Sequence, residues 1–321
     1  MTKKAIHRIA FLFPGQGAQY PGMARDFVQN FSAARLAFEE ADELLQRSLS
    51  SIILDGPEAV LTETKNSQAG IFVASMALFR VVQELYDLKP FVCAGLSLGE
   101  YTALTSAGYL SFREALPLVE LRGQFMNEAC ESSPGEMAVV MGLDANEVVE
   151  AVREVNLPQD LWVANFNCPG QVVISGTKLG IEAGTAALKK RNAKRILPLP
   201  VHGAFHSGLM QQARDKLSPY LKKAMLVKGS SQLVMNVPGD FVSDLEDMRR
   251  NLTEQVTHSV RWEQGIRAME DQKIDLYIEF GPGKALSGMN KRIGVQAPTL
   301  SIEKVDDLKL IEELMKKGER V

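Results

Sequence analysis

The sequence contains little cysteine, little histidine and no excess of either charge. Its three cysteines, Cys93, Cys130 and Cys168, lie far apart and form no CxxC pair. An odd number of isolated cysteines argues against a disulfide framework and a zinc site, and it favours reduced thiols in a cytoplasmic compartment. The 36 Lys and Arg against 39 Asp and Glu give a net charge of -3, without the basic excess of a nucleic-acid-binding module. We therefore expect no metal site and no nucleic acid partner.

Long hydrophobic runs are also missing. The apolar run Ile9–Phe13 is too short for the core of a signal peptide. No run approaches the roughly 20 residues that span a membrane, so we expect a cytoplasmic protein without a membrane partner. With 45% apolar residues among 321, the chain can bury a sizeable core as one large domain or two unequal ones.

Short apolar runs alternate with longer helical patterns over most of the chain, without an internal repeat. This alternation is typical of an α/β fold with a mostly parallel sheet. The expected strands are Ile9–Phe13, Phe91–Ala94 and Ile274–Phe280. The expected helices are Ser32–Gln46, Ser67–Leu85, Glu100–Ala107 and Ser111–Glu131, the last with a kink or a late start at Pro117.

The segment 133–202 has a different order of predicted strands and helices. Its pattern is strand, helix, strand, strand, helix, strand, which is the split βαβ order of a ferredoxin-like subdomain. The strands are predicted at Met137–Gly142, Leu161–Phe166, Val172–Ser175 and Arg195–Leu199, and the helices at Ala145–Val155 and Leu179–Asn192. Pro198 and Pro200 place the last strand at a sheet edge. We therefore predict a body of residues 1–132 and 203–321, interrupted by the subdomain 133–202.

One motif carries catalytic chemistry. Gly95-Leu96-Ser97-Leu98-Gly99 fits G-x-S-x-G, with an apolar strand before it and a helical pattern after it. A tight strand-to-helix turn strains the backbone, and the flanking glycines avoid clashes. The hydroxyl of Ser97 would then project at a helix N-terminus, where free N–H groups can stabilise an oxyanion. The alternative is a Gly/Ser turn that merely caps a helix, but the flanking elements favour a nucleophile.

A nucleophilic serine needs a base, and the chain has only four histidines. His206 lies in Gly203-Ala204-Phe205-His206-Ser207, a run of mostly small residues after a proline-bounded strand, as expected of an active-site loop. His202 competes with it four residues upstream, and the pattern separates the two poorly. His7 is expected at the surface, and His258, near Trp262, could equally be a packing residue.

Two glycine motifs do not support nucleotide binding. Gly15-Gln16-Gly17 begins like a dinucleotide fingerprint, but Tyr20 stands in place of the third glycine. Gly283-Lys284 suggests a P-loop, but Ala285 replaces its Ser/Thr. We expect no permanently bound cofactor.

Arg122 lies on an apolar helical pattern. Such an arginine usually snorkels or forms a salt bridge. If it instead faces the serine, its planar fork suits a substrate carboxylate.

Six motifs in order resemble a known family. They are Phe13-Pro14-Gly15-Gln16-Gly17-Ala18-Gln19, Gly95-Leu96-Ser97-Leu98-Gly99-Glu100-Tyr101, Leu121-Arg122-Gly123, Asn165-Phe166-Asn167, Gly203-Ala204-Phe205-His206-Ser207 and Gly281-Pro282-Gly283-Lys284. From about residue 9 to 302, the chain resembles the malonyl-CoA:acyl carrier protein transacylases, which are the loading enzymes of fatty-acid synthesis. The resemblance implies a hydrolase-like α/β body with a ferredoxin-like insertion.

The resemblance also implies roles for single residues. Ser97 matches the acylated nucleophile, His206 its general base, and Gln255 the residue whose main-chain carbonyl orients that histidine. Gln16 and Leu98 match the backbone donors of the oxyanion hole, Arg122 matches the clamp for the malonyl carboxylate, and Phe205 and Asn167 match substrate-binding positions. The chain departs from the pattern at Leu96, where many members have histidine.

The resemblance implies malonyl-CoA as substrate and an acidic acyl carrier protein as partner. The densest positive run, Lys189, Lys190, Arg191, Lys194 and Arg195, is a candidate docking patch, although cations at a helix C-terminus are favoured in any case. A serine esterase or thioesterase, a non-catalytic carrier-binding module and a polyketide-pathway malonyltransferase are the alternatives. We expect a monomer.

Overall fold

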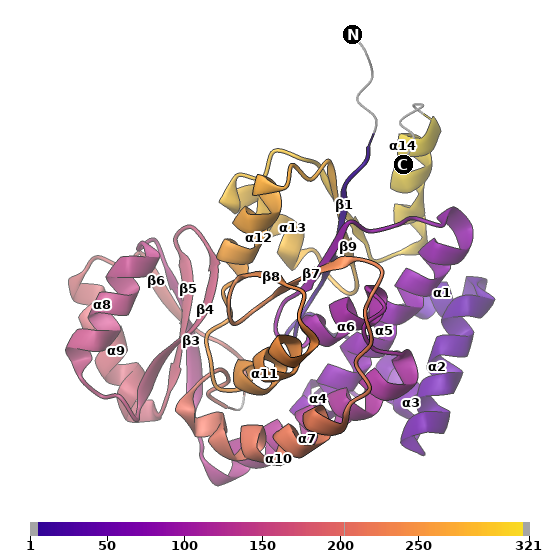
Figure 1. Ribbon diagram of the computed structural model, residues 1–321. Helices are drawn as coiled ribbons and strands as arrows, with labels where there is room; N and C mark the ends of the chain where they lie inside the picture. The colour runs from indigo at the N-terminus through magenta and orange to yellow at the C-terminus, as the bar shows by residue number, and fades with distance from the viewer. Residues whose placement is uncertain (1–5, 202, 317–321) are drawn as a thin grey trace.

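The computed structural model describes residues 6–201 and 203–316, and it contains two sheets (Figure 1). The larger sheet has the strand order β10-β9-β1-β2-β7-β8. Its neighbours run parallel except for the antiparallel pair β7 and β8. The strands are β1 (Ile9–Phe13), β2 (Val92–Gly95), β7 (Gln232–Met235), β8 (Asp240–Val242), β9 (Leu276–Phe280) and β10 (Thr299–Ile302). The predicted α/β class with a mostly parallel sheet is confirmed.

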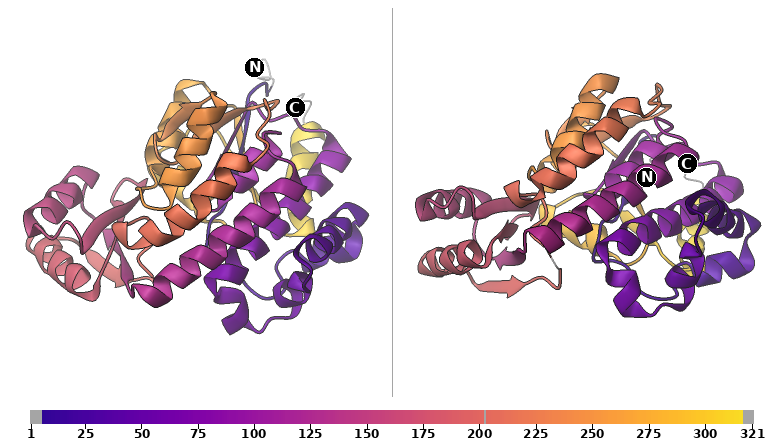
Figure 2. Two further views of the ribbon diagram at one scale, coloured as in Figure 1. Left: turned by 60° about the horizontal axis from the view of Figure 1, so that its bottom comes forward. Right: turned by 90° about the horizontal axis from the view of Figure 1, so that it is seen from below.

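The smaller sheet is antiparallel and lies to one side of the body, covered by α8 (Ala145–Val155) and α9 (Lys178–Lys190) (Figure 2). Its strands are β3 (Glu136–Met141), β4 (Leu161–Cys168), β5 (Gln171–Gly176) and β6 (Arg195–Pro198), in the order β4-β5-β3-β6. The predicted ferredoxin-like order of elements is confirmed, and Pro198 lies on an edge strand as expected. The division at residues 132 and 202 stays a prediction.

The remaining helices surround the larger sheet. They are α1 (Arg25–Asn30), α2 (Ser32–Leu45), α3 (Leu49–Asp55), α4 (Glu58–Thr62), α5 (Thr64–Tyr86), α6 (Gly99–Ser106), α7 (Phe112–Ser132), α10 (Gln211–Lys223), α11 (Leu245–Gln255), α12 (Trp262–Asp271), α13 (Ala285–Ile293) and α14 (Leu308–Lys316), with 3-10 turns at Gly208–Met210 and Val305–Asp307. The suggested late start of α7 at Pro117 was wrong, because the Ser111 hydroxyl accepts a hydrogen bond from the Glu114 N–H and the helix begins at Phe112.

Both faces of the larger sheet are buried, as parallel sheets require. On β1, Phe11 faces α5, where its ring lies 6.0 Å from that of Phe79. Its neighbours Ala10 and Leu12 point to the other side, into a second apolar cluster with Trp262 of α12 and residues of α13. The alternation along one strand therefore joins two helical layers into one core.

One helix of the described residues, α5, is long and apolar enough to span a membrane by length and composition alone. This helix has 23 residues, and its most apolar window has a mean hydropathy of 1.3. Of that window, 67% is buried inside the protein. Core helices meet the same criteria of length and composition, and the packing of α5 is that of a core helix.

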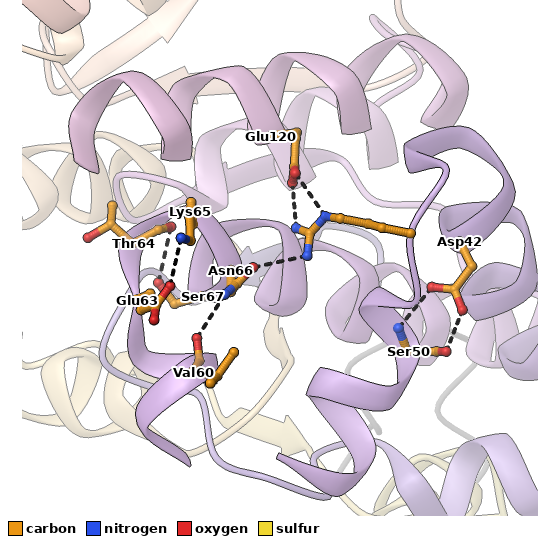
Figure 3. A network of polar contacts seen from close by, with 10 residues as sticks. Asp42, Ser50, Val60, Glu63, Thr64, Lys65, Asn66, Ser67 and Glu120 are labelled. Atoms are coloured by element: carbon orange, nitrogen blue, oxygen red, sulfur yellow. Dashed lines mark hydrogen bonds and ion pairs between the residues drawn. The ribbon is translucent and has the colours of Figure 1, made fainter. Parts of the chain in front are cut away.

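A polar network fastens the start of α5 to α7 (Figure 3). The guanidinium of Arg47 binds the carboxylate of Glu120 through two bonds of 3.0 and 2.9 Å, and it donates a third, of 3.0 Å, to Asn66. Asn66 in turn donates to the carbonyl of Val60. Bidentate pairs fix orientation as well as distance. The network therefore sets how α5 and α7 lie against each other, and both helices contribute to the site below.

The turn between β2 and α6 has no room for side chains at its glycines. A Cβ at Gly95 would lie 1.9 Å from the backbone carbonyl of Gly99, and a Cβ at Gly99 would lie 2.2 Å from the carbonyl oxygen of Phe13. Between them Ser97 has a φ of 52°, in the left-handed region that costs most residues about 1 kcal/mol or more. Close packing of β1, β2 and α6 thus holds one serine in a strained position.

We predict that Gly95→Ala removes most of the folded protein, because its new methyl group would meet backbone atoms that cannot move independently. The matched control is Gly288→Ala in α13, where nothing lies within 4 Å of the position that the new methyl group would take. That variant should gain about 0.5–1 kcal/mol in the free energy of unfolding. Urea denaturation of both variants measures the difference. Equal stability of Gly95→Ala and the unchanged chain would contradict the packing argument.

Candidate active site

Ser97 and His206 meet although 109 residues separate them in the chain. The Oγ of Ser97 lies 2.8 Å from the Nε2 of His206. His206 lies in the loop before the 3-10 turn Gly208–Met210, has a φ of 58° and is 4% exposed. A serine hydroxyl within hydrogen-bond reach of a buried imidazole is the arrangement that generates a nucleophile.

The other ring nitrogen of His206 is held by main chain. Its Nδ1 lies 2.8 Å from the carbonyl oxygen of Gln255, the last residue of α11. Because a carbonyl can only accept, this contact places the proton on Nδ1 and leaves Nε2 free to take the proton of Ser97. Burial and, secondarily, the positive charge of Arg122 lower the pKa of His206 to about 4. The imidazole is therefore neutral and ready to act as a base at neutral pH.

Of the other histidines, His7 and His258 lie away from Ser97. His7 is exposed beside β1, as expected. His258 is exposed as well, and its Nδ1 lies 2.8 Å from the main-chain carbonyl oxygen of Glu254. The competing candidate His202 lies outside the described residues. His206 is thus favoured by its own contact with Ser97.

Arg122 of α7 faces the serine and does not snorkel, since it is only 1% exposed. Its Nη2 donates to the Oγ of Ser97 at 3.1 Å and to the side-chain oxygen of Gln255 at 2.9 Å, and its Nη1 donates to the side-chain oxygen of Gln68. Its Nε finds no partner among the described residues. Burial lowers the pKa of this guanidinium, which Tyr101 and Glu100 partly counteract. A dry cation held by neutral amide oxygens retains a strong attraction for an anion.

Two backbone N–H groups near Ser97 are uncommitted. Within residues 6–201 and 203–316, the amides of Gln16 and Leu98 donate to no other group. Leu98 directly follows Ser97 at the start of α6, and Gln16 lines the same cavity as Ser97. These are the positions from which two donors could converge on an oxyanion.

A cavity of about 270 Å³ opens onto Ser97 between the two sheets. The body contributes Gln16, Leu96 and Met289, and the smaller sheet contributes Asn167 and Val173. The expected substrate-binding residues Asn167 and Phe205 both line it, whereas Arg122 lies behind its wall. The side-chain oxygen of Asn167 is buried without a partner among the described residues. A mostly apolar cavity with a few polar groups suits an acyl chain and the thioester that carries it.

Three residues of the site escaped sequence reasoning. The side-chain oxygen of Gln68 accepts a hydrogen bond from Arg122. Asn236 accepts from the N–H of Ser97 at 2.6 Å and donates to the carbonyl of Gly95 at 2.7 Å. The carboxyl group of Glu100 accepts from both Asn236 and Gln255. Glu100 directly follows the serine motif, and this position is the one local signal that could have pointed to it. Gln68 sits in an apolar helix and Asn236 follows a short strand, so neither carries a local pattern that points to a site.

The expected docking patch is divided in the structure. Arg191 pairs with Glu150 at 3.3 Å and with Glu154 at 2.7 Å, so its charge is neutralised locally. Lys189 and Lys190 are exposed at the end of α9. Lys194 and Arg195 line a separate surface groove together with Arg292 of α13.

No cluster of three or more metal-binding side chains occurs in the described part of the chain.

Comparison with known proteins places the chain in a family. Residues 10–292 match the acyl transferase domain model. The chain is 39% identical over 312 residues to the malonyl CoA-acyl carrier protein transacylase of Bacillus subtilis, covering 97% of this chain and 98% of that protein. It is also 39% identical over 286 residues to the Escherichia coli K12 protein of that name, covering 89% of this chain and 93% of that protein.

Solved structures agree. An acyl carrier protein S-malonyltransferase from Vibrio cholerae has a TM-score of 0.91 and 36% identity, over 95% of this chain and all of the other. A malonyl-transacylase solved in complex with its type II polyketide synthase acyl carrier protein has a TM-score of 0.92 and 37% identity, over 96% of this chain and 99% of the other. With this identity along nearly its whole length, the chain belongs to the acyl transferase family and, within it, to the malonyl CoA-acyl carrier protein transacylases.

Proposed function

We propose that this protein transfers a malonyl group from malonyl-CoA to the phosphopantetheine thiol of an acyl carrier protein, through an ester on Ser97. The observation that carries the proposal is one serine oxygen in contact with both a neutral histidine and a buried arginine. The histidine supplies a base, and the arginine supplies a site for the free carboxylate that distinguishes malonyl from simple acyl groups.

In the first half-reaction, the Oγ of Ser97 gives its proton to the Nε2 of His206 and attacks the thioester carbonyl. The resulting oxyanion accepts hydrogen bonds from the N–H groups of Gln16 and Leu98. Collapse of the tetrahedral intermediate breaks the carbon–sulfur bond, and the coenzyme A sulfur takes the proton from His206. Losing one such backbone donor costs on the order of 3 kcal/mol in the barrier.

The second half-reaction runs the same steps with another thiol. The phosphopantetheine thiol gives its proton to His206 and attacks the Ser97 ester. Collapse of this second intermediate returns the proton to Ser97 and releases malonyl carrier protein. A single base thus serves both halves, and coenzyme A and the carrier protein bind in turn.

Arg122 confers the preference for malonyl in this proposal. Its guanidinium is held by the amide oxygens of Gln68 and Gln255, and one of its nitrogens already contacts the oxygen that becomes acylated. An acyl group on Ser97 would therefore lie beside a cation, and a carboxylate two bonds from the ester carbonyl could pair with it. This geometry favours a malonyltransferase over a generic serine esterase.

We propose that the carrier protein docks at the basic groove, in which Lys194 and Arg195 of the predicted docking patch lie beside Arg292 of α13. Its cations carry no ion pair within the described residues, unlike Arg191. Charge reversal of Lys194 together with Arg195 should weaken carrier affinity and reduce its salt dependence, and an unchanged salt dependence would assign docking elsewhere.

We also propose a cytoplasmic monomer without a resident cofactor, metal or membrane partner, serving fatty-acid or polyketide synthesis.

One labelling experiment tests the transferase reaction. The protein is incubated with radiolabelled malonyl-CoA, and then either holo-carrier protein or buffer alone is added. Label that stays on Ser97 until the carrier arrives is the expected result, with Ser97→Ala as the unlabelled control. Rapid loss of label to water would identify a hydrolase, and no label at all would contradict both enzyme functions.

We predict that Arg122→Ala lowers kcat/KM for malonyl-CoA by about 100-fold or more while largely sparing acetyl transfer, because a buried charge pair is worth several kcal/mol. Rates of Ser97 acylation with the two thioesters measure this. Arg113→Ala is the matched control, since Arg113 lies on the same helix but is 61% exposed. An equal loss for both acyl groups would refute the carboxylate clamp.

We predict that acylation by acetyl-CoA persists far below the usual histidine range. The pKa of His206 is lowered, so the neutral base survives as pH falls below 6.5 and is lost only as pH passes through about 4. Single-turnover rates measured between pH 3.5 and 8 give the pH at which the acylation rate falls to half. Circular dichroism at each pH separates it from acid unfolding, to which a buried neutral histidine contributes over the same interval. A midpoint near 6.5 would contradict the assigned environment.

A further inference from the structure

Glu100 is a fully buried carboxyl group that no step of the mechanism uses. It lies in the first turn of α6, three residues after Ser97, and is 0% exposed. It forms no ion pair among the described residues, and both of its oxygens accept from neutral N–H groups. One accepts from the main-chain N–H of Asn236 at 2.6 Å, and the other from the side-chain amide of Gln255 at 2.7 Å. A carboxyl group in such a place needs a reason, because burying one is costly.

The two partners of Glu100 touch every reacting group. The side chain of Asn236 holds the backbone on both sides of the serine turn, through the carbonyl of Gly95 and the N–H of Ser97. Gln255 donates to the carbonyl of Ser97 at 2.9 Å, and its own main-chain carbonyl orients His206. One carboxyl group therefore fixes the two residues on which the serine turn and the base depend.

The orientation of the Gln255 amide connects Glu100 to Arg122. The NH2 group of this amide points to Glu100 and to the Ser97 carbonyl, so its oxygen points to the guanidinium of Arg122. The flipped amide would set its donor against the guanidinium and its acceptor against two other acceptors. Two oxygens of an ionised Glu100 thus select the rotamer that presents an acceptor to Arg122.

When Glu100 is ionised, this arrangement also provides Arg122 with a distant countercharge. The amide of Gln255 stands between the guanidinium and the carboxylate, so the opposite charges attract without touching. The cation is stabilised in the buried site, yet its nitrogens are not consumed by a direct salt bridge. Tyr101, adjacent on α6, stays a neutral phenol because burial raises its pKa. His206, on the other side of Gln255, is neutral as well.

We propose that Glu100 is a positioning residue for acyl selectivity, which acts through Gln255 to aim Arg122 at the carboxylate of a malonyl group. The inference rests on the proposed function, since it explains how the same site distinguishes malonyl from acetyl. Burial raises the pKa of Glu100 to about 8, so its ionisation falls within a range that an assay can cover. Protonation replaces one acceptor with a donor and loosens the amide of Gln255.

The test compares malonyl-CoA with acetyl-CoA as acyl donors to Ser97. In Glu100→Gln the new NH2 group faces an N–H donor, so we expect the malonyl-to-acetyl ratio of kcat/KM to fall at least 10-fold. The matched control is Glu279→Gln. Glu279 is a carboxyl group of equal burial, and it accepts from the N–H groups of Leu286 and Ser287 at the start of α13. The control should lose stability with an unchanged ratio.

The unmodified protein provides a second measurement that does not depend on the folding of a variant. Its malonyl-to-acetyl ratio should rise with pH as Glu100 ionises around pH 8, and this rise should vanish in Glu100→Gln. A flat ratio from pH 6.5 to 9.5, or an equal loss of both activities in Glu100→Gln, would overturn the inference. Absence of label on Ser97 in the unmodified protein would instead refute the proposed function itself.

Discussion

The site depends on the contact between three backbones, those of β1, β2 and α6. Only glycine fits at residues 95 and 99, because a Cβ at either would overlap main-chain atoms. This contact forces the turn between them to be tight, and the tight turn places Ser97 in the left-handed region at a helix N-terminus. Exposure of the hydroxyl and availability of the next N–H are consequences of the same packing. The strain is held by the core on both faces of the larger sheet.

Burial of Arg122 is the second constraint, and much of the surrounding polar structure serves to satisfy it. A dry guanidinium must find acceptors, which come from α5 through Gln68 and from α11 through Gln255. The relative placement of α5 and α7 is fixed within one helical turn of these residues, because the Arg47 network joins Asn66 of α5 to Glu120 of α7. The amide oxygens satisfy donors without neutralising the charge. The site therefore keeps a cation for an anionic substrate and stays folded in its absence.

Patterns of neighbouring residues predicted those features of this protein that depend on neighbouring residues alone. The alternation of short strands and helices, the glycine-flanked serine and the order of elements in the smaller sheet all followed from local patterns, and the ordered motifs pointed to the family. The partners Gln68 and Asn236 could not be predicted, and the motif that contains Glu100 did not reveal its contacts, because the three residues converge only when α5, α6 and the end of β7 pack together. The docking patch stays a prediction, and it shows what a local run of charge cannot reveal. Five nearby cations were expected to form one surface, but Arg191 is neutralised by α8.

The main-chain carbonyl of Gln255, which holds His206, helps to explain why a thiol, and not water, receives the acyl group. Where a carboxylate holds the histidine, it stabilises the imidazolium that forms during attack. Here a neutral carbonyl holds it, and burial together with the nearby guanidinium keeps its pKa near 4. Such a weak base can assist a thiol, whose pKa is about 8.5, far better than water, whose pKa is about 15.7. In the proposed second half-reaction a thiol is therefore far easier to activate than water, whereas in the first the Ser97 oxygen is helped by its contact with the Arg122 guanidinium.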